Sequence, residues 1–246
     1  MNSPLTPAQR LAHHAKLAVY RAGFEVRRET FKRHFVHSLR QHGVDTVIDI
    51  GANAGQFAGE LRRGGFTGRI VSVEPLGEAF ARLQAAAAAD PGWDVRRAAV
   101  GAEPGTLTMN VAGNSTSSSV LPMLSRHTDA APQTAYVATE DVEAVTVDGL
   151  VAEYGLAPAT TLLKIDVQGY EGAVLDGAPA TLAEVAAVRT EMSLAALYEG
   201  QALFGDLLAR LEALDFELWS IEPGFVEPGT GRLLQADGIF YRAPSA

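Results

Sequence analysis

The sequence has no cysteine among its 246 residues, which excludes disulfides, thiolate zinc sites and a cysteine nucleophile and fits a reducing compartment. It also has no apolar run that approaches the roughly 18 to 20 residues of a membrane-spanning helix. Its N-terminal stretch lacks the uninterrupted apolar core and the cleavage pattern of a secretion signal. We therefore expect a cytoplasmic protein with no stable membrane insertion.

What the chain does have is apolar content and an uneven distribution of charge. Hydrophobic residues make up 47% of the sequence, enough for the core of one α/β domain with a small extra segment. The net charge is −9, but residues 1–43 carry +6 from eight Lys and Arg and two Glu, so the remainder carries −15. We accordingly divide the chain into a basic helical segment, 1–43, and a domain, 44–246.

The basic segment has two interpretations. One is an arm that contacts phosphate, nucleic acid or an anionic membrane surface. The other, which we favour, is a helical lid or a dimer element packed against the acidic body. The basic residues are spread around the helix, and no aromatic stacking platform accompanies them. On this interpretation the protein binds no nucleic acid, and a homodimer is one form that it can take.

Hydrophobic periodicity predicts two helices at residues 6–22 and 24–42, followed by short apolar strands that alternate with helices. Alternation of this kind predicts an α/β fold, with helices on both faces of a parallel sheet. The last two strands follow each other without a helix, which predicts an antiparallel pair at one edge. We expect strands at 44–50, 69–74, 94–100, 160–166, 185–191, 216–222 and 237–243, and helices at 77–89, 170–182 and 201–214.

One segment departs from this alternation. Residues 112–140 are rich in Ser, Thr, Pro and Gly and lie between two of the expected strands. A loop of this length inside a compact domain is usually functional or disordered. Because the segment lies near the carboxyl edge of the sheet, where ligands bind in open α/β folds, we predict a loop that covers the substrate.

The stretch VIDIGANAGQF is typical of a strand that runs into a glycine loop and then a helix. Read from Gly51, a dinucleotide fingerprint would need two further glycines that are missing, and Asn53 stands in the place of the first of them. A phosphate-binding P-loop is excluded because no G-K-[ST] follows. What remains is an acid, Asp49, two residues before Gly51, and Gly55 four residues after it. This pattern suits a cofactor with a cationic end and no pyrophosphate.

S-adenosylmethionine is such a cofactor. Asp49 can meet the positive amino end of its methionine part, directly or through water, and the glycines let the backbone approach closely. Glu74 ends the second strand, where a carboxylate can accept hydrogen bonds from both ribose hydroxyls. The residues after the third strand are expected to flank the adenine. The full set expected to bind the cofactor is Asp49, Gly51, Asn53, Gly55, Glu74, Ala98 and Ala99.

Several blocks of the sequence resemble those of the FkbM-family methyltransferases, in the same order and at similar spacing. They are VIDIGANAGQF, VEP, AAVGAEPGTL, LLKIDVQGYEGAVLDGA, TEMS and DGIFYR, and they cover residues 44–242. The resemblance implies the class I methyltransferase fold, which is Rossmann-like, with a seven-stranded sheet whose last strand is antiparallel. It also implies an S-adenosylmethionine-dependent O-methyltransferase that acts on a hydroxyl of a sugar or of a polyketide-type secondary metabolite.

The block LLKIDVQGYEG can be interpreted from its residues alone. Asp166 falls at the carboxyl end of a strand and faces the expected crevice, where an acid has little packing purpose. Lys164 projects from the same face of the strand, and we interpret it as a partner that balances a neighbouring carboxylate. Glu171 lies in the first turn of the next helix and is either a helix-terminus residue or a substrate-binding residue. Glu191, at the end of the following strand, reaches the same edge of the sheet.

Two roles are open for the acid pair Asp166 and Glu191. Together they offer oxygen ligands to Mg²⁺, which would lower the pKa of a substrate hydroxyl. Alternatively, one of them is the general base that takes the proton from this hydroxyl. We favour the second role, because methyltransferases with a clear metal site at these positions usually show an acid pair after the fifth strand. Here Met192 and Ser193 follow Glu191.

Three residues of the 112–140 segment complete the expected site. His127 is the only histidine outside the basic segment, and it is a candidate base because an imidazole titrates near neutrality. The alternative is a solvated loop histidine. Ser117 and Ser118 either offer hydroxyls to the substrate or belong to a flexible loop. We expect the acceptor to be a small molecule or a glycan with a free hydroxyl.

Two other functions remain open. An NAD-dependent reductase would use an acid such as Glu74 equally well, but the missing glycines disfavour it. A non-catalytic module would bind RNA or membrane through the basic segment, while the domain serves as a scaffold. The intact acidic crevice argues against this second alternative.

Overall fold

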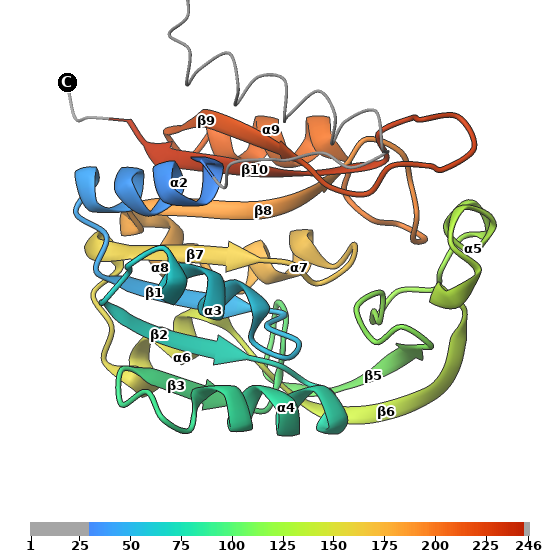
Figure 1. Cartoon of the computed structure of the whole chain (residues 1–246), viewed down its shortest axis with the longest axis horizontal. Coiled ribbons are helices and arrows are strands. Elements are labelled where there is room, and N and C mark those ends of the chain that lie inside the picture. The colour runs from blue at the N-terminus through green and yellow to red at the C-terminus, as the bar shows by residue number, and fades with distance from the viewer. Residues whose placement is uncertain (1–29, 244–246) are drawn as a thin grey trace, which may run out of the picture.

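The computed structural model describes residues 30–243 of the chain. Seven strands form the central sheet in the order β3-β2-β1-β7-β8-β10-β9; β10 is antiparallel to both of its neighbours, and the other neighbouring strands are parallel. The expected seven-stranded sheet with an antiparallel last strand is therefore confirmed (Figure 1). The strands are β1 (Thr46–Ile50), β2 (Arg69–Val73), β3 (Trp93–Arg96), β7 (Thr161–Ile165), β8 (Ala187–Ser193), β9 (Phe216–Pro223) and β10 (Gln235–Arg242).

Helices cover both faces of this sheet. On one face, α2, α3 and α4 bury Leu39, Leu61 and Leu83 in a common core. On the other face, α6, α7, α8 and α9 contribute to a second core, with Leu150 and Leu207 among its members. The helices are α2 (Thr30–Gln41), α3 (Gln56–Arg63), α4 (Gly77–Ala87), α6 (Val147–Tyr154), α7 (Glu171–Asp176), α8 (Pro179–Glu184) and α9 (Phe204–Glu212).

The central strands β1 and β7 are buried at every position. Helices on both faces exclude water from them, which explains why their sequences are almost continuously apolar. Val47 and Leu162 belong to the core beneath α2, α3 and α4. Asp49 follows Val47 by two residues, and Lys164 follows Leu162 by two, so both project from the same face of the sheet. Two charged side chains therefore lie at the edge of this core that is nearest the carboxyl ends of the strands.

Helix α2 belongs to the segment predicted to be a separate basic element. The prediction of a helix over 24–42 is confirmed for the part that the structure describes, and the helix expected at 6–22 lies outside the described residues. Phe35, Val36 and Leu39 are buried in the core shared with α3 and β1. The end of the basic segment is thus an integral part of the domain.

A second, three-stranded sheet corrects two expectations. The strand expected at 94–100 is divided between β3 and β4, and the segment 112–140 is not one long loop. It holds α5 (Ser125–Ala130), a 3-10 turn and the ends of two strands, and it curves away from the central sheet (Figure 1). The sheet has the order β4-β6-β5 and is formed by β4 (Ala99–Val100), β5 (Gly105–Ala112) and β6 (Tyr136–Val145); the 3-10 turns are η1 (Pro132–Thr134) and η2 (Pro158–Thr160).

The helix expected at 170–182 is also divided, into α7 and α8. Gly177 ends α7, and a Cβ atom added there would lie 2.1 Å from the carbonyl oxygen of Gly101. Pro179 then begins α8, because proline lacks the N–H that a continuous helix would need at this position. The break brings the backbone of this segment into close contact with the start of the second sheet.

Within residues 30–243, none of the helices combines the length and the apolar composition needed to cross a lipid bilayer.

Candidate functional site

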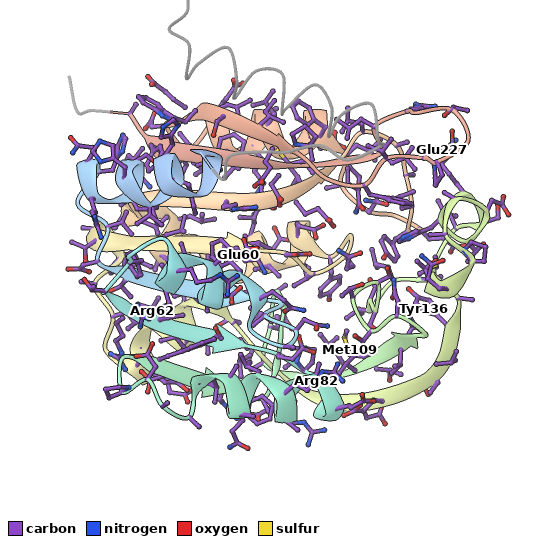
Figure 2. All side chains as sticks on the ribbon, viewed as in Figure 1. Glu60, Arg62, Arg82, Met109, Tyr136 and Glu227 are labelled. Atoms are coloured by element: carbon purple, nitrogen blue, oxygen red, sulfur yellow. The ribbon has the colours of Figure 1, made fainter. Side chains whose placement is uncertain are left out.

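A cavity of about 510 Å³ lies at the carboxyl edge of the parallel strands. Residues that follow β1, β2 and β7 line it from the sheet, and residues between β5 and β6 line it from the opposite side. Glu60 of α3 and Met109 of β5 both contribute to this lining (Figure 2). The position is the one at which open α/β sheets bind ligands.

The glycine loop after β1 packs tightly and has a left-handed backbone. Gly51 lines the cavity with φ +73°, and a Cβ atom there would lie 1.8 Å from the carbonyl oxygen of Asp166. Gly55 has φ +83° and faces the side chain of Trp93, away from the cavity lining. Asn53, also left-handed with φ 46°, lines the cavity and accepts a hydrogen bond from the Ala54 amide. Of the two glycines, only Gly51 is therefore placed to contact a ligand.

Glu74 connects the glycine loop to the end of β2. Its Oε2 accepts a hydrogen bond from the Asn53 amide at 2.8 Å, and its Oε1 accepts one from the Leu76 amide at 3.0 Å. Each oxygen keeps a further lone pair, and the residue lines the cavity. Burial raises the pKa of Glu74 to about 7, against the two amide hydrogen bonds that lower it. The carboxylate is thus held in position for two more donors, as the hydroxyls of a ribose would supply.

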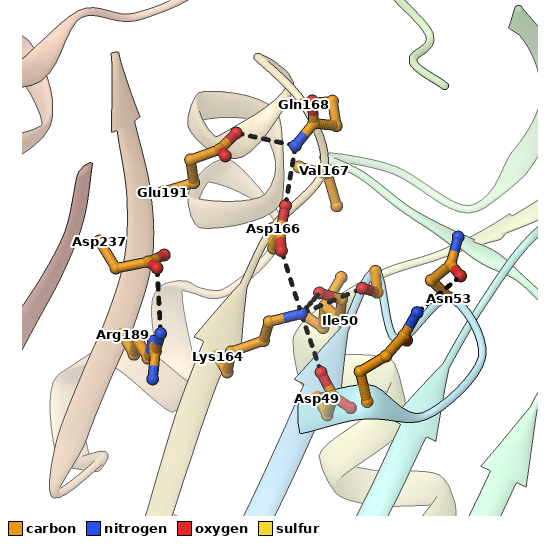
Figure 3. A network of polar contacts seen from close by, with 12 residues as sticks. Asp49, Ile50, Asn53, Lys164, Asp166, Val167, Gln168, Arg189, Glu191 and Asp237 are labelled. Atoms are coloured by element: carbon orange, nitrogen blue, oxygen red, sulfur yellow. Dashed lines mark hydrogen bonds and ion pairs between the residues drawn. The ribbon is translucent and has the colours of Figure 1, made fainter. Parts of the chain in front are cut away.

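Asp49, expected to meet the cofactor directly or through water, does not line the cavity. Its side chain is fully buried, and it accepts a hydrogen bond from Ser72 at 3.1 Å. The ammonium of Lys164 lies 3.0 Å from Asp49 Oδ1 and 3.6 Å from Asp166 Oδ2, so it stands between the two acids (Figure 3). Lys164 also donates to the carbonyl of Gly51 at 3.0 Å. It balances buried carboxylates, as interpreted from the sequence, and ties β7 to the glycine loop.

Asp166 and Glu191 both lie at the expected edge of the sheet, and a side-chain amide lies between them. Gln168 Nε2 donates to Asp166 Oδ1 and to Glu191 Oε2, each at 3.0 Å (Figure 3). Gln235 donates to the same Glu191 oxygen at 2.7 Å. Burial and the neighbouring charge of Asp166 raise the pKa of Glu191 well above its usual range. Asp166 lines the cavity directly. Glu191 does not line it, but its hydrogen-bond partners Gln168 and Gln235 do.

The magnesium alternative finds no support in this arrangement. A metal ion bridging Asp166 and Glu191 would need oxygen ligands directed at it, and here amide N–H groups point at both carboxylates. No group of three or more His, Asp or Glu side chains that could hold a metal occurs among residues 30–243. The residues therefore do not fit the ion.

Glu171 is placed beneath the loop after β7 and does not line the cavity. Its Oε1 accepts hydrogen bonds from the amides of Val167 and Gly169, both at 3.1 Å. Burial raises its pKa to about 7. This placement agrees with the interpretation of Glu171 as a helix-terminus residue. Its carboxylate holds the backbone of the loop that carries Asp166 and Gln168.

His127 is not a solvated loop residue. It is 3% exposed, lines the cavity from α5, and packs edge-on against Tyr198 with ring centroids 5.3 Å apart. Its Nδ1 has no hydrogen-bond partner within the described residues. Burial lowers its pKa to about 4, so the imidazole is neutral at physiological pH and one ring nitrogen can accept a hydrogen bond.

Four further residues of the expected site also line the cavity: Ser117, Ser118, Ala98 and Ala99. Ser117 and Ser118 line it, but their hydroxyls are engaged within the segment. Ser118 accepts from the Ala112 amide at 3.0 Å, and Ser117 accepts from the Asn114 side chain at 3.0 Å. Ala98 and Ala99 are buried and form part of the apolar lining near β4.

Gln168, Arg189 and Asp237 are among the cavity residues that were not predicted from the sequence. Gln168 has φ 56°, a conformation that turns its side chain back toward Asp166. Arg189 lies two residues before Glu191 on the same face of β8. The alternation of side chains along this strand could therefore have indicated that Arg189 lies on the same side as the predicted acid. Asp237 of β10 is the register partner of Glu191 on β8, which only the strand pairing shows.

Comparison with protein families gives one match that covers more than half of the chain. The family is described as Methyltransferase FkbM domain, and it matches residues 49–218. This range contains the glycine loop, Glu74, Asp166, Gln168 and Glu191. A search among curated proteins finds no match.

Solved structures with low sequence identity are also similar to this chain. EvdMO1 is 13% identical with a TM-score of 0.44, and the alignment covers 87% of this chain but only 40% of EvdMO1. An rRNA methylase from Streptococcus thermophilus is 7% identical with a TM-score of 0.47, covering 90% of this chain and all of the other. An S-adenosylmethionine-dependent methyltransferase from Mesorhizobium loti is 11% identical with a TM-score of 0.43, covering 84% and 96%.

Proposed function

The chain belongs to the FkbM family of methyltransferases and is an S-adenosylmethionine-dependent methyltransferase, and from this premise we propose that it methylates a hydroxyl of a sugar or of a polyketide-type metabolite. One observation carries the proposal. A single cavity joins Glu74 and the glycine loop to Asp166 and His127. Methyl transfer to oxygen is an in-line displacement, so donor and acceptor must share one such space.

The cofactor half of the cavity fits S-adenosylmethionine. Glu74 has lone pairs free for the two ribose hydroxyls, and Ala98 and Ala99 provide a flat apolar surface for the adenine. When bound, the cofactor supplies an electrophilic methyl carbon attached to a positively charged sulfur. The carboxylates that line the cavity favour a ligand with this charge.

We propose that Asp166 activates the acceptor. Its side chain is 37% exposed and lines the cavity, while Gln168 and Lys164 fix its orientation from two sides. We assign it the hydrogen bond from the acceptor hydroxyl. With the methyl donor bound, the Asp166 carboxylate would accept the proton that the hydroxyl loses as its oxygen takes the methyl group from the sulfonium.

The acceptor half of the cavity is lined by neutral hydrogen-bonding groups. Asn114, Gln133, Thr134 and Gln168 lie there with the neutral imidazole of His127. Amides and hydroxyls both donate and accept hydrogen bonds, which matches the hydroxyls of a sugar or polyketide. This lining supports an uncharged acceptor over a phosphorylated one.

The first test is calorimetric titration of the protein with S-adenosylmethionine and, separately, with NADH. Binding of S-adenosylmethionine alone is expected, and binding of NADH alone would favour the reductase alternative. The second test incubates the protein with S-adenosylmethionine carrying a deuterated methyl group and a panel of hydroxylated sugars and polyketides. Mass spectrometry should show transfer of the labelled methyl to oxygen, abolished or reduced at least about 100-fold by Asp166→Asn.

The outcome of the second test separates acceptor classes. Transfer to a nitrogen or carbon acceptor, with no transfer to oxygen, would contradict the proposed chemistry. Full activity of Asp166→Asn would contradict the role given to this acid. Glu184→Gln, on α8, is a suitable control, because this residue does not line the cavity.

A further inference from the structure

The cavity is rich in carboxylates and poor in cations. Among the described residues that line it, Lys164 and Arg189 are the two side chains that carry a positive charge at neutral pH. His127 also lines it, but its burial keeps it neutral. An anionic group on a ligand would therefore find few partners, and which of the two cations is free to bind it can be decided from their contacts.

Lys164 has no capacity left for a ligand. Its ammonium has three protons and four oxygen atoms around it: the carbonyls of Ile50 and Gly51 at 3.2 and 3.0 Å, Asp49 at 3.0 Å and Asp166 at 3.6 Å. Its side chain is only 7% exposed. The positive charge of Lys164 is thus compensated by groups of the protein itself.

Arg189 has unused donors. Its guanidinium contacts Glu222 at 2.9 Å and Asp237 at 3.0 Å, and both contacts come from Nη2. No hydrogen bond found in residues 30–243 uses Nε or Nη1, although an arginine has five N–H donors. A planar fork with free donors binds a carboxylate in two-point geometry.

Two aromatic rings hold this guanidinium in place. Its central carbon lies 5.4 Å from the ring centre of Phe35 on α2 and 5.1 Å from that of Phe57 on α3. Phe57 also lines the cavity. Contacts of this kind restrict the plane of the guanidinium, so a ligand that binds it loses little side-chain entropy.

The strand register places Arg189 at the correct end of the cofactor. Asp49, Lys164 and Arg189 are paired partners on β1, β7 and β8. With the adenine at Ala98 and the ribose at Glu74, the amino-acid end of a bound cofactor would extend across β1 toward β7 and β8. Arg189 and Asp237 lie there side by side and match the two charges of an α-amino acid.

We propose that Arg189 binds the α-carboxylate of S-adenosylmethionine, an inference that rests on the proposed function. Asp49, the acid first expected to contact the amino-acid end, is screened by Lys164. The residue that binds the amino-acid end is thus Arg189, two strands away from Asp49. Because the ring of Phe35 packs on Arg189, α2 also contributes to the cofactor site.

The test is calorimetric titration with S-adenosylmethionine and with its decarboxylated form, which keeps the adenosine, the sulfonium and the ammonium. In Arg189→Met, the affinity for S-adenosylmethionine should fall by about 10- to 100-fold, and the affinity for the decarboxylated form should change by less than about threefold. Arg189→Lys should recover part of the loss. Arg69→Met, at the opposite end of β2, is the matched control and should leave both affinities unchanged.

Because Arg189→Met leaves Glu222 and Asp237 without their partner, a second variant adds Glu222→Gln and Asp237→Asn, and thermal unfolding checks that each variant is folded. An equal loss of affinity for both ligands, or no loss for either, would overturn the assignment of Arg189. If the wild-type protein bound neither ligand, the proposed function would fail as well. If it bound S-adenosylmethionine and Arg189→Met did not alter the selectivity between the two, only this inference would fail.

Discussion

The ammonium of Lys164 lies 3.0 Å from the carboxylate of Asp49, and the two side chains are 7% and 0% exposed. We expect Lys164→Met to lower the free energy of unfolding by about 3 to 5 kcal/mol, because it leaves a buried carboxylate uncompensated. The double variant Asp49→Asn with Lys164→Met should recover at least half of this loss. Urea unfolding measures both, and an equal loss in the single and double variants would contradict the electrostatic explanation.

Two left-handed glycines provide a matched pair for testing the loop after β1. Gly43 has φ +69° with nothing within 4 Å of an added Cβ, so Gly43→Ala should cost only about 1 to 2 kcal/mol. Gly51→Ala adds a clash with the Asp166 carbonyl and should cost more than about 3 kcal/mol. It should also abolish binding of S-adenosylmethionine. Chemical unfolding and calorimetry check these values, and equal effects of the two substitutions would be inconsistent with the packing described.

Cofactor affinity should depend on pH through Glu74. The pKa of this buried acid is raised to about 7, and its ionised form is the better acceptor for ribose hydroxyls. Affinity for S-adenosylmethionine should thus be full above this pKa and fall by up to about tenfold per pH unit below it. Calorimetry between about pH 5.5 and 8.5 should show this slope in the wild type and in Glu171→Gln, but not in Glu74→Gln. The same slope in Glu74→Gln would refute the assignment.

His127 should remain neutral over the physiological range. Its pKa is lowered to about 4 by burial, below the value of an exposed histidine, so the unfolded chain binds the extra proton first. Stability should consequently decrease as the pH falls from about 6.5 toward 4, and this part of the decrease should be absent in His127→Asn. In NMR spectra, the ring signal missing from His127→Asn should not titrate between about pH 5 and 8. A midpoint near 6.5 would place the imidazole in solvent.

The parts of the site that the sequence predicted depend on local patterns. Apolar strands that end at Gly51, Glu74 and Asp166 indicate a parallel sheet, and parallel strands bring their carboxyl ends to one edge. The antiparallel pair at the end of the chain followed from two successive strands with no helix between them. These features need no knowledge of which strand lies beside which.

The parts that it missed depend on register and on backbone conformation. Asp49 and Lys164 are 115 positions apart, and their pairing across β1 and β7 decides that the acid is screened. The left-handed turn at Gln168 places an amide between two acids, an arrangement that no spacing rule contains. The strands of the second sheet were not predicted because only two of the ten β6 residues are buried, so this strand lacks an extended apolar pattern.

The second sheet has a consequence for how this enzyme can diverge. Its strand β4 pairs with β6 through Ala99 and Val100, and the segment between β5 and β6, which packs against Leu197 and Tyr198, carries His127 and the serines that line the cavity. Gly51, Glu74 and Arg189, which we assign to the cofactor, lie outside this segment, on β8 and at the ends of β1 and β2. Mutations in the segment between β5 and β6 can therefore change which acceptor is recognised while leaving the methyl donor site intact. A variant selected for a new acceptor then keeps its affinity for the methyl donor.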